Sequence, residues 1–242
     1  MELASRQQEL LRAIIEEYIE TAEPVGSETI VRKYNLGVSP ATIRNEMVEL
    51  TDLGFLKKPY ASAGRIPSPP ALKFYIQTLM KEHELPVKDE VSIKESLWDN
   101  RFEFDKLLKE ASKQLSEKTG TLAIANTEGG DTYYYGAASI LDMPEFIDID
   151  LTKSILSLLD DSTLLSEIFS RVIGDSDVHI LIGDDLEIEN LLPCSFVFSN
   201  FGAGRRFAGT VGVIGPARMH YPKVVPTVRY FGHLLNEAAA SW

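Results

Sequence analysis

The feature that most constrains the fold is a set of three helix patterns followed directly by a short basic hairpin, all in the N-terminal third of the chain. Between Leu10 and Ile19, apolar residues recur every three or four positions, and this spacing predicts an amphipathic helix that ends before Pro24. A second, shorter helix is expected over residues 27–34, with Ser27 as its N-cap. The pattern therefore predicts a helical unit at the start of the chain.

A third helix and a hairpin complete this unit. Ser39-Pro40 places a capping residue before a proline at the first helical position, and Gly54 closes the helix. Residues 55–70 are typical of a short hairpin whose turn lies at 61–65. Three helices followed by a tight basic hairpin are the pattern of a winged helix-turn-helix.

The third helix has one apolar and one polar face. Because successive helical residues turn by about 100°, Ile43, Met47 and Leu50 fall on one side, which is expected to pack inward. The other side carries side-chain types that read base edges: arginine on guanine, asparagine on adenine and methyl groups on thymine. A capped surface helix with ordinary polar residues is the alternative, and this helix alone does not separate the two. The residues expected to face DNA are Ala41, Thr42, Arg44 and Asn45.

The hairpin favours the DNA-binding interpretation. Its small residues allow the backbone to approach a duplex, and its basic side chains suit phosphates. The alternative is that the charges belong to an edge strand and protect it from aggregation. Ser39 and the N–H groups of the helix's first turn also suit a phosphate, and Ser27 belongs to the same candidate set. The hairpin candidates are Lys57, Lys58, Tyr60, Ser62 and Arg65. Arg65 is expected at the tip of the hairpin, where it could enter the minor groove instead of contacting a phosphate.

Charge is distributed unevenly along the chain. The formal net charge of −12 is unusual for a nucleic-acid-binding protein. Residues 1–80 contribute only −1 to it and residues 81–242 contribute −11, while the segment 29–75 carries a local +4. Phosphate binding responds to the local field, so a basic module attached to an acidic body is compatible with DNA binding.

The remainder of the chain indicates an α+β domain. Leu72, Tyr75, Ile76 and Leu79 indicate a further helix, and we expect a polar linker over 81–89 and one long helix over 92–118. From residue 119 onward, strand patterns alternate with helix patterns, and a closing helix is expected over 221–240. We therefore expect a winged-helix domain over 1–82, a linker and connecting helix over 83–118, and an α+β domain over 119–242.

Several protein classes are excluded or disfavoured. Cys194 is the only cysteine, so an intrachain disulfide is impossible, which fits a reducing cytoplasm. No apolar run is long enough to span a bilayer, and residues 1–8 lack a secretory core, so we expect a cytoplasmic protein with no membrane partner. The four histidines lack metal-ligand spacing, and we find no catalytic constellation. We expect no enzyme activity, no metal and no cofactor.

Four segments of the chain resemble one family closely, and in that family's order. They are Glu23-Pro24-Val25-Gly26-Ser27, Val38-Ser39-Pro40-Ala41-Thr42-Ile43-Arg44-Asn45-Glu46-Met47, Ala61-Ser62-Ala63-Gly64-Arg65-Ile66-Pro67 and Gly209-Thr210-Val211-Gly212-Val213-Ile214-Gly215-Pro216-Ala217-Arg218-Met219-His220-Tyr221. Residues 136–146 match more weakly. On these motifs the chain resembles the heat-inducible transcription repressors of the HrcA family.

The resemblance implies a winged-helix DNA-binding domain joined to a GAF-like α+β domain. It implies a homodimer that binds double-stranded DNA at an inverted-repeat operator and represses chaperone and chaperonin operons. It also implies that the chaperonin GroEL promotes the active repressor and that heat stress releases it from the operator. A ligand-sensing transcriptional regulator, in which the GAF-like domain binds a small molecule, is the alternative function.

The chain is shorter than typical members, which carry an inserted dimerisation domain within the GAF-like part. Here the corresponding stretch is only residues 126–131. The remaining candidate dimer surfaces are the apolar faces of the expected helices at 92–118 and 221–242, or else the first of these helices simply packs on the sheet. The first helix contributes Leu97, Trp98, Phe102, Phe104, Leu107 and Leu108.

Overall fold

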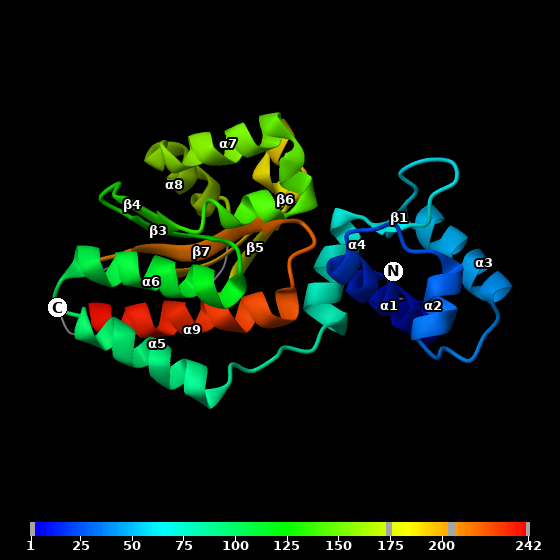
Figure 1. Ribbon diagram of the computed structural model, residues 1–242, viewed down its shortest axis with the longest axis horizontal. Helices are drawn as coiled ribbons and strands as arrows, with labels where there is room; N and C mark the ends of the chain where they lie inside the picture. Colours follow the sequence, from blue (N-terminus) through cyan, green and yellow to red (C-terminus); the bar gives the residue numbers. More distant parts are fainter. Residues whose placement is uncertain (1–2, 173–175, 203–206, 241–242) are drawn as a thin grey trace. The chain divides into compact units, whose positions relative to one another are not determined.

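The computed structural model describes residues 3–172, 176–202 and 207–240, and the chain divides into two compact units (Figure 1). The first unit is Met1–Lys81 and the second is Glu82–Trp242. Each unit has its own buried apolar core. The segment 83–118, expected to connect the domains, contributes its two helices to the second unit.

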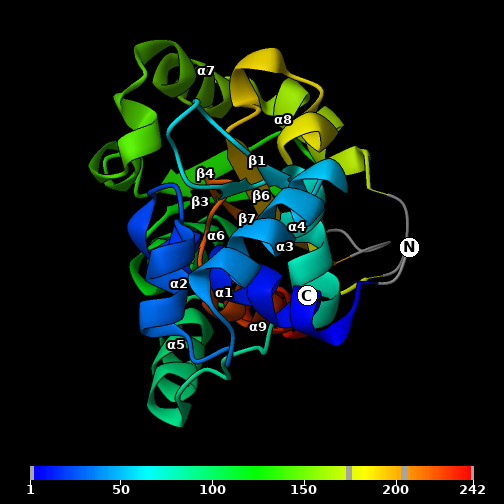
Figure 2. The ribbon, with the colours of Figure 1, turned by 90° about the vertical axis from the view of Figure 1, so that its right-hand side faces the viewer.

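The first unit consists of helices and a two-stranded hairpin. Its elements are α1 (Ser5–Thr21), α2 (Ser27–Lys33), α3 (Pro40–Asp52), β1 (Leu56–Lys57), β2 (Ile66–Pro67), α4 (Pro69–Phe74) and the π-helical turn η1 (Tyr75–Leu79). The strands pair antiparallel, with Leu56 opposite Pro67. The connecting loop projects beyond the helices as the wing, drawn in cyan (Figures 1 and 2).

The predicted apolar faces form the core of this unit. Leu10, Ile14, Ile30, Ile43 and Leu50 are all at most 1% exposed. Burial of side chains of this size contributes about 1.5–3 kcal/mol each, which explains why the three helices pack around them. The amphipathic patterns therefore predicted the arrangement of α1, α2 and α3 correctly.

One local prediction in this unit was wrong. Ser27 is not an N-cap: Gly26 occupies that position, and Ser27 is the first helical residue and is buried. The helix expected after the hairpin is confirmed as α4 and η1. It begins at Pro69, where the hydroxyl of Ser68 accepts a hydrogen bond from the Ala71 N–H.

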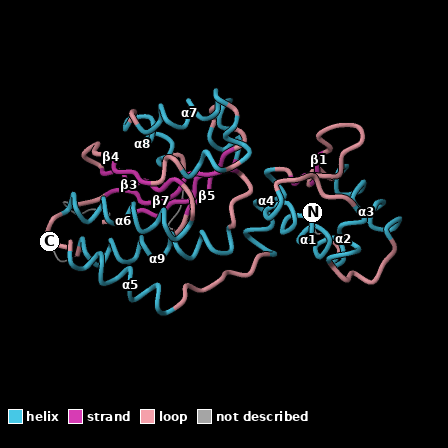
Figure 3. The backbone as a smooth tube through the Cα atoms, viewed as in Figure 1, coloured by secondary structure: helices cyan, strands magenta, loops and turns pink. Residues whose placement is uncertain are grey.

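The second unit is built on a five-stranded antiparallel sheet in the order β4-β3-β7-β6-β5. The strands are β3 (Leu122–Thr127), β4 (Thr132–Tyr135), β5 (His179–Ile182), β6 (Cys194–Phe201) and β7 (Gly209–Pro216). Helices cover both faces of the sheet (Figures 1 and 3). Short 3-10 turns lie at Ser139–Asp142, Pro144–Ile147, Gly183–Leu186 and Glu189–Leu191.

The two faces of the sheet are packed differently. On one face, α7 (Ile149–Leu159) and α8 (Ser162–Ser170) enclose an apolar cluster that includes Ile124, Phe196 and Phe198. On the other face lie α6 (Phe104–Thr119) and α9 (Tyr221–Ala239), with α5 (Val87–Asp99) packed against both (Figure 1). Alternation along the strands places apolar side chains on each face. The α+β class that the sequence predicted is confirmed.

The single helix expected over residues 92–118 was wrong. The chain forms α5 and α6 instead, separated by a turn at residues 100–103. Asn100 ends α5: its N–H donates to the Leu97 carbonyl at 3.1 Å, and its side-chain amide donates to the Ser96 carbonyl at 3.0 Å. The break lets α5 fold back against α6 and α9, and Leu97 on α5 and Leu107 on α6 are both buried.

Candidate nucleic-acid interface

The start of α3 is fixed by a cap. Ser39 is the N-cap, and its hydroxyl oxygen accepts a hydrogen bond from the Thr42 N–H at 3.2 Å. The Ser39 and Thr42 hydroxyls also lie 3.0 Å apart, within hydrogen-bonding distance of one another. Pro40 occupies the first turn, as predicted. This arrangement stabilises the end of α3 that carries the predicted base-reading residues.

The exposed face of α3 is the one that the helical periodicity predicted. Ile43, Met47 and Leu50 are buried. Thr42 is half-buried beside the cap. The other predicted contact residues are exposed: Ala41, Arg44 and Asn45. Val48 lies on the same face and is 43% exposed.

Two contacts anchor α3 to α1. The buried carboxylate of Glu46 pairs with the guanidinium of Arg6, and the Gln7 side-chain amide donates to Glu49 Oε2 at 3.1 Å. A buried carboxylate paired with a guanidinium fixes the geometry between two elements, whatever its net contribution to stability. These anchors fix α3 against α1, and Thr42 and Asn45 line a hollow together with the anchoring side chains. Neither Arg6 nor Gln7 was predicted, since their partners are about 40 residues away in the sequence.

The wing presents basic and aromatic side chains on its exposed surface. Lys57, Lys58 and Ser62 are exposed, and Tyr60 is 61% exposed near the turn of the hairpin. An exposed tyrosine among lysines can stack or hydrogen-bond on a sugar-phosphate backbone while the lysines neutralise phosphates. The structure thus places the four predicted wing residues on the end of β1 and on the loop that follows it.

Arg65 differs from the prediction, because it does not lie at the tip. Its backbone pairs with that of Val25, with N–H···O distances of 2.8 and 2.9 Å. Its guanidinium Nε donates to the Thr51 hydroxyl oxygen at 3.0 Å. Arg65 is therefore half-buried at the base of the wing and connects it to α3 and to the segment before α2. Thr51, which holds it, was missed by sequence reasoning.

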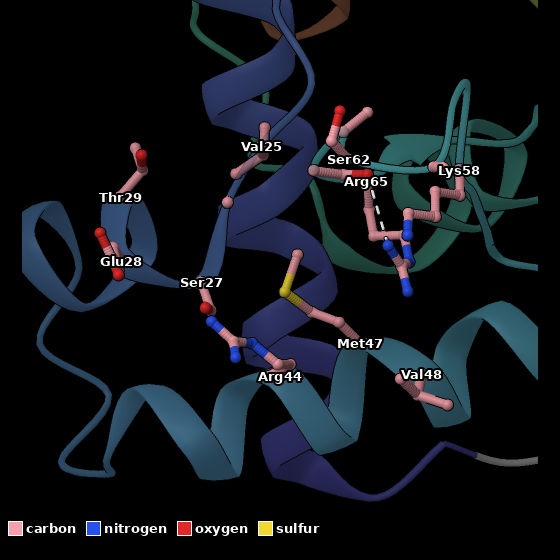
Figure 4. A pocket seen from close by; sticks show the side chains of 14 residues that line it. Val25, Ser27, Glu28, Thr29, Arg44, Met47, Val48, Lys58, Ser62 and Arg65 are labelled. Carbon is pink, nitrogen blue, oxygen red and sulfur yellow. Dashed lines mark hydrogen bonds between the residues drawn. The ribbon is translucent and has the colours of Figure 1, made fainter.

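A hollow of about 470 Å³ lies between the start of α2, α3 and the wing (Figure 4). Arg44 extends toward Ser27 on one side of it, and Lys58 and Arg65 line the other (Figure 4). Glu28 is the acidic residue of its lining. Three cations around an open concave surface match the convex, anionic backbone of a duplex.

The second unit contains a separate polar hollow of about 410 Å³ at one end of the sheet. Its amide and hydroxyl groups bond to each other: Asn126 Nδ2 donates to Ser166 Oγ at 2.8 Å, and Thr210 Oγ1 donates to Asn200 Oδ1 at 2.8 Å. The adjoining face of the sheet is filled by the apolar cluster under α7 and α8. Nothing here selects a class of small molecule, so the ligand-sensing alternative gains no support.

We also considered a reactive thiol, a metal site and a membrane-spanning helix in the residues that the structure describes. Cys194 is fully buried, and burial followed by the neighbouring Glu145 charge raises the pKa of its thiol to about 12, so it stays protonated and unreactive. Within residues 3–172, 176–202 and 207–240, no group of three or more histidine, cysteine or acidic side chains is placed to hold a metal ion. In the same ranges, no helix combines the length and apolarity needed to cross a membrane.

Comparison with known families decides the assignment. Residues 2–81 match the model of the winged helix-turn-helix transcription repressor, HrcA DNA-binding, and residues 72–225 match the model of the HrcA protein C terminal domain. The chain belongs to the HrcA family. The resemblance in the four sequence segments is thereby confirmed, and so is the expected fold class of a winged helix-turn-helix followed by an α+β domain.

Similar proteins support this assignment over the whole chain. The heat-inducible transcription repressor HrcA of Symbiobacterium thermophilum is 29% identical, with 96% of this chain and 97% of that protein covered. The protein of the same name from Acetivibrio thermocellus is 28% identical, with 98% and 96% covered. A solved structure, described as a hypothetical protein, superposes with a TM-score of 0.79 at 17% identity over 99% of both chains, which supports the fold.

The lengths of these HrcA relatives also bear on the missing insertion. The alignment with the Symbiobacterium thermophilum protein extends over 332 positions, whereas this chain has 242 residues. That relative therefore contains a long stretch without counterpart in this chain. Here β3 connects to β4 through a tight turn, in which the Thr127 N–H donates to the Asp131 carbonyl at 2.9 Å.

Proposed function

We propose that this HrcA-family protein represses heat-shock operons by binding an inverted-repeat operator in the cytoplasm, and that heat stress releases it. The observation that carries the proposal is the exposed face of α3, with Arg44 and Asn45 beside a concave basic surface bordered by the wing. This arrangement suits insertion of α3 into the major groove while the wing follows the backbone. The protein is a DNA-binding repressor and not an enzyme.

The roles of the individual residues follow from their chemistry and position. We assign base reading to the exposed residues of α3, since Arg44 and Asn45 are the side-chain types that bond guanine and adenine, and Ala41 and Thr42 carry methyl groups. Phosphate contacts fall to Ser39 and to the wing. The wing residues so assigned are Lys57, Lys58, Tyr60, Ser62 and Arg65; Ser27 borders the hollow from α2.

An inverted repeat has two-fold symmetry, and one winged helix reads one half-site, so we propose that two copies bind together. The family resemblance implies a response to the chaperonin GroEL, and we include this chaperonin as a proposed partner. Residues 81–242 carry a net charge of −11 and should repel DNA, whereas the segment 29–75 carries +4. We therefore assign DNA binding to the segment 29–75.

The test starts from a pool of duplexes of random sequence, from which the protein selects the sequence that it binds most tightly. Selection by the full chain should recover an inverted repeat. The selected duplex, a single half-site and a scrambled duplex are then titrated at several stated salt concentrations, since affinity without salt is uninterpretable. Equal affinity for the selected and scrambled duplexes would contradict the proposal of sequence-specific repression.

A further inference from the structure

Some of the large apolar side chains that the second unit leaves exposed form one stripe along α5 and the turn after it. Val87 is 73% exposed, Val91 is 50% exposed and Trp98 is 44% exposed, and their spacing places them on one side of the helix. Phe102, 68% exposed, follows in the turn after α5. The inward face of the helix is separate, since Ile93 and Leu97 are buried. We call Val87, Val91, Trp98 and Phe102 the α5 stripe.

The aromatic end of the stripe is held in place before any partner arrives. The guanidinium carbon of Arg101 lies 4.8 Å from the centroid of the Trp98 ring and 4.1 Å from that of Phe102. Such cation–π contacts order exposed rings, and tryptophan and arginine are the residue types that most often dominate binding energy at protein interfaces. A surface that is ordered and apolar in the free chain loses little side-chain entropy on association.

We propose that the α5 stripe is the interface through which two copies of this chain pair, with the two α5 helices antiparallel. The inference rests on the proposed function in one respect: an inverted repeat requires two copies. It concerns what replaces the inserted domain that the longer relatives carry. The occupant is a second copy, because the two halves of the stripe complement each other in side-chain size.

Antiparallel packing matches the shape of the stripe and keeps the two Arg101 side chains apart. Its first half carries two valines and its second half two aromatic rings, so the reversed partner places large side chains over small ones. A parallel pair would instead set Trp98 against Trp98 and Arg101 against Arg101, opposing two cations. Lys94, near the middle, lies 3.5 Å from Glu237, so its charge is balanced within its own chain.

Other exposed or apolar surfaces fit a second copy less well. Ile147 and Ile149 are 78% and 79% exposed, but Asp148 and Asp150 alternate with them, so two copies would bring carboxylates together. The apolar face of α9 is covered within its own unit. Of the six residues predicted for a dimer surface, Leu97, Leu107 and Leu108 are buried and Phe104 is half-buried, with its ring centroid 4.6 Å from that of Phe207.

The small size of the α5 stripe limits the expected affinity between the two copies. Val87 and Trp98 are about 16 Å apart along the helix at 1.5 Å per residue. Two such stripes bury less than the roughly 1,200 Å² of a standard stable interface. The pair should therefore dissociate in the micromolar range on its own, and DNA that holds both copies should tighten it.

Sedimentation equilibrium of the full chain tests the interface directly. Trp98→Asp and, independently, Val91→Asp should each weaken self-association by at least about tenfold, because a carboxylate would be buried against the partner. Ile149→Asp places the same charge on a more exposed apolar site outside the stripe and should leave self-association unchanged. Unchanged thermal unfolding and circular dichroism identify variants that are folded. A folded Trp98→Asp variant that associates like the wild type would overturn the proposal, and so would a wild type that remains monomeric with and without DNA.

Cross-linking tests the antiparallel direction. Lys94→Cys places a thiol near the middle of the stripe, where two antiparallel copies meet, and should form an intermolecular disulfide under mild oxidation. Val87→Cys should not, because the two copies of position 87 then lie at opposite ends of the pair. Buried Cys194 provides a low background. Disulfide formation by Val87→Cys but not by Lys94→Cys would exclude the antiparallel arrangement.

DNA titration separates this inference from the proposed function. The Trp98→Asp variant should bind a single half-site like the wild type but lose at least about tenfold of the additional affinity for the full repeat. Failure of the wild type to prefer the selected half-site over scrambled DNA counts against the proposed function alone. Retention of the full-repeat advantage by Trp98→Asp counts against the stripe alone.

Discussion

The side chain of Arg65 donates a hydrogen bond from Nε to the Thr51 hydroxyl oxygen at 3.0 Å and so joins the wing to the last turn of α3. The Thr51 hydroxyl in turn donates to the Met47 carbonyl at 2.7 Å, which fixes the acceptor in place. Together with the backbone pairing of Arg65 and Val25, this contact sets the position of the wing relative to the predicted recognition helix. The wing therefore depends on a threonine that does not itself lie in it.

Thr51→Val should reveal this role. Valine keeps the shape of threonine but lacks the hydroxyl, so the guanidinium of Arg65 loses its acceptor while its charge remains. We expect DNA affinity to fall by a few-fold, in line with about 0.5–1.5 kcal/mol for one hydrogen bond, at an unchanged salt slope. Arg65→Ala should weaken binding further and lower the slope by about one unit. Equal slopes for the wild type and Arg65→Ala would show that this arginine positions the wing without contacting phosphate.

The recognition helix should respond differently from the wing. Arg44→Ala and Asn45→Ala should each cost about 1–3 kcal/mol on the selected site and much less on random DNA, because bidentate base contacts exist only on the correct sequence. Fluorescence anisotropy on both duplexes measures the difference. Lys106→Ala removes one exposed charge from the second unit and should change neither affinity. Equal losses on both duplexes would mean that the α3 side chains contact phosphates only.

The wing lysines should act through charge alone. Lys57→Ala and Lys58→Ala are expected to weaken binding to all sequences to a similar extent and to reduce the salt slope by about one unit for each phosphate that is no longer neutralised. Titration of each variant over a range of salt concentrations gives the slope. A slope equal to that of the wild type would place the exposed wing off the DNA.

Sequence reasoning predicted the parts of the site that depend on local periodicity. The inward face of α3 at Ile43, Met47 and Leu50, and its cap at Ser39, follow from spacings within one helix, and both hold in the structure. The position of Arg65 does not follow from such spacings, because its partners Val25 and Thr51 are 40 and 14 residues away. A hairpin turn is visible in a sequence, whereas the contact that orients the hairpin is not.

The break between α5 and α6 shows a second limit. Apolar residues recur at helical spacing on both sides of it, so Leu97 and Leu107 suggest one continuous helix. The decisive feature is the Asn100 cap. Asparagine is favoured at helix ends but also occurs inside helices, so its presence alone did not locate the break. The exposure of Trp98 and Phe102 could be known only once the two helices were seen to fold back on the sheet.

Gly64 should prove essential to the wing for steric reasons. A Cβ atom at this position would lie 2.4 Å from the Val25 carbonyl oxygen and 2.9 Å from the Pro24 carbonyl carbon, both of them backbone atoms that cannot rotate away. Gly64→Ala should therefore destabilise the first unit by about 1–3 kcal/mol and disrupt the pairing of Val25 with Arg65. Gly26→Ala is the matched control, since a Cβ there meets nothing within 4 Å. Denaturant unfolding and DNA titration of both variants measure the effect, and wild-type behaviour of Gly64→Ala would contradict it.

His179 should make the stability of the second unit depend on pH. It lies on β5, is 6% exposed and its ring centroid is 5.4 Å from that of Phe198. Burial lowers the pKa of its imidazole below the ordinary value of 6.5, because the charged form is desolvated. In the unfolded chain the same imidazole regains its ordinary pKa, so below pH 6.5 the unfolded state binds the proton more readily.

The contribution of His179 is therefore fully present above about pH 6.5 and declines as the pH falls from there toward the lower pKa of the folded state. Replacing it with an uncharged residue, as in His179→Gln, should flatten the decrease in unfolding free energy between about pH 7.5 and pH 5. His83→Gln, at an exposed position, is the control and should leave the decrease closer to that of the wild type. Denaturant titrations at several pH values give the unfolding free energy of each variant. If His179→Gln keeps the full wild-type slope over this window, then the folded state binds the proton at His179 as readily as the unfolded state does, and the acid sensitivity of the second unit has another source.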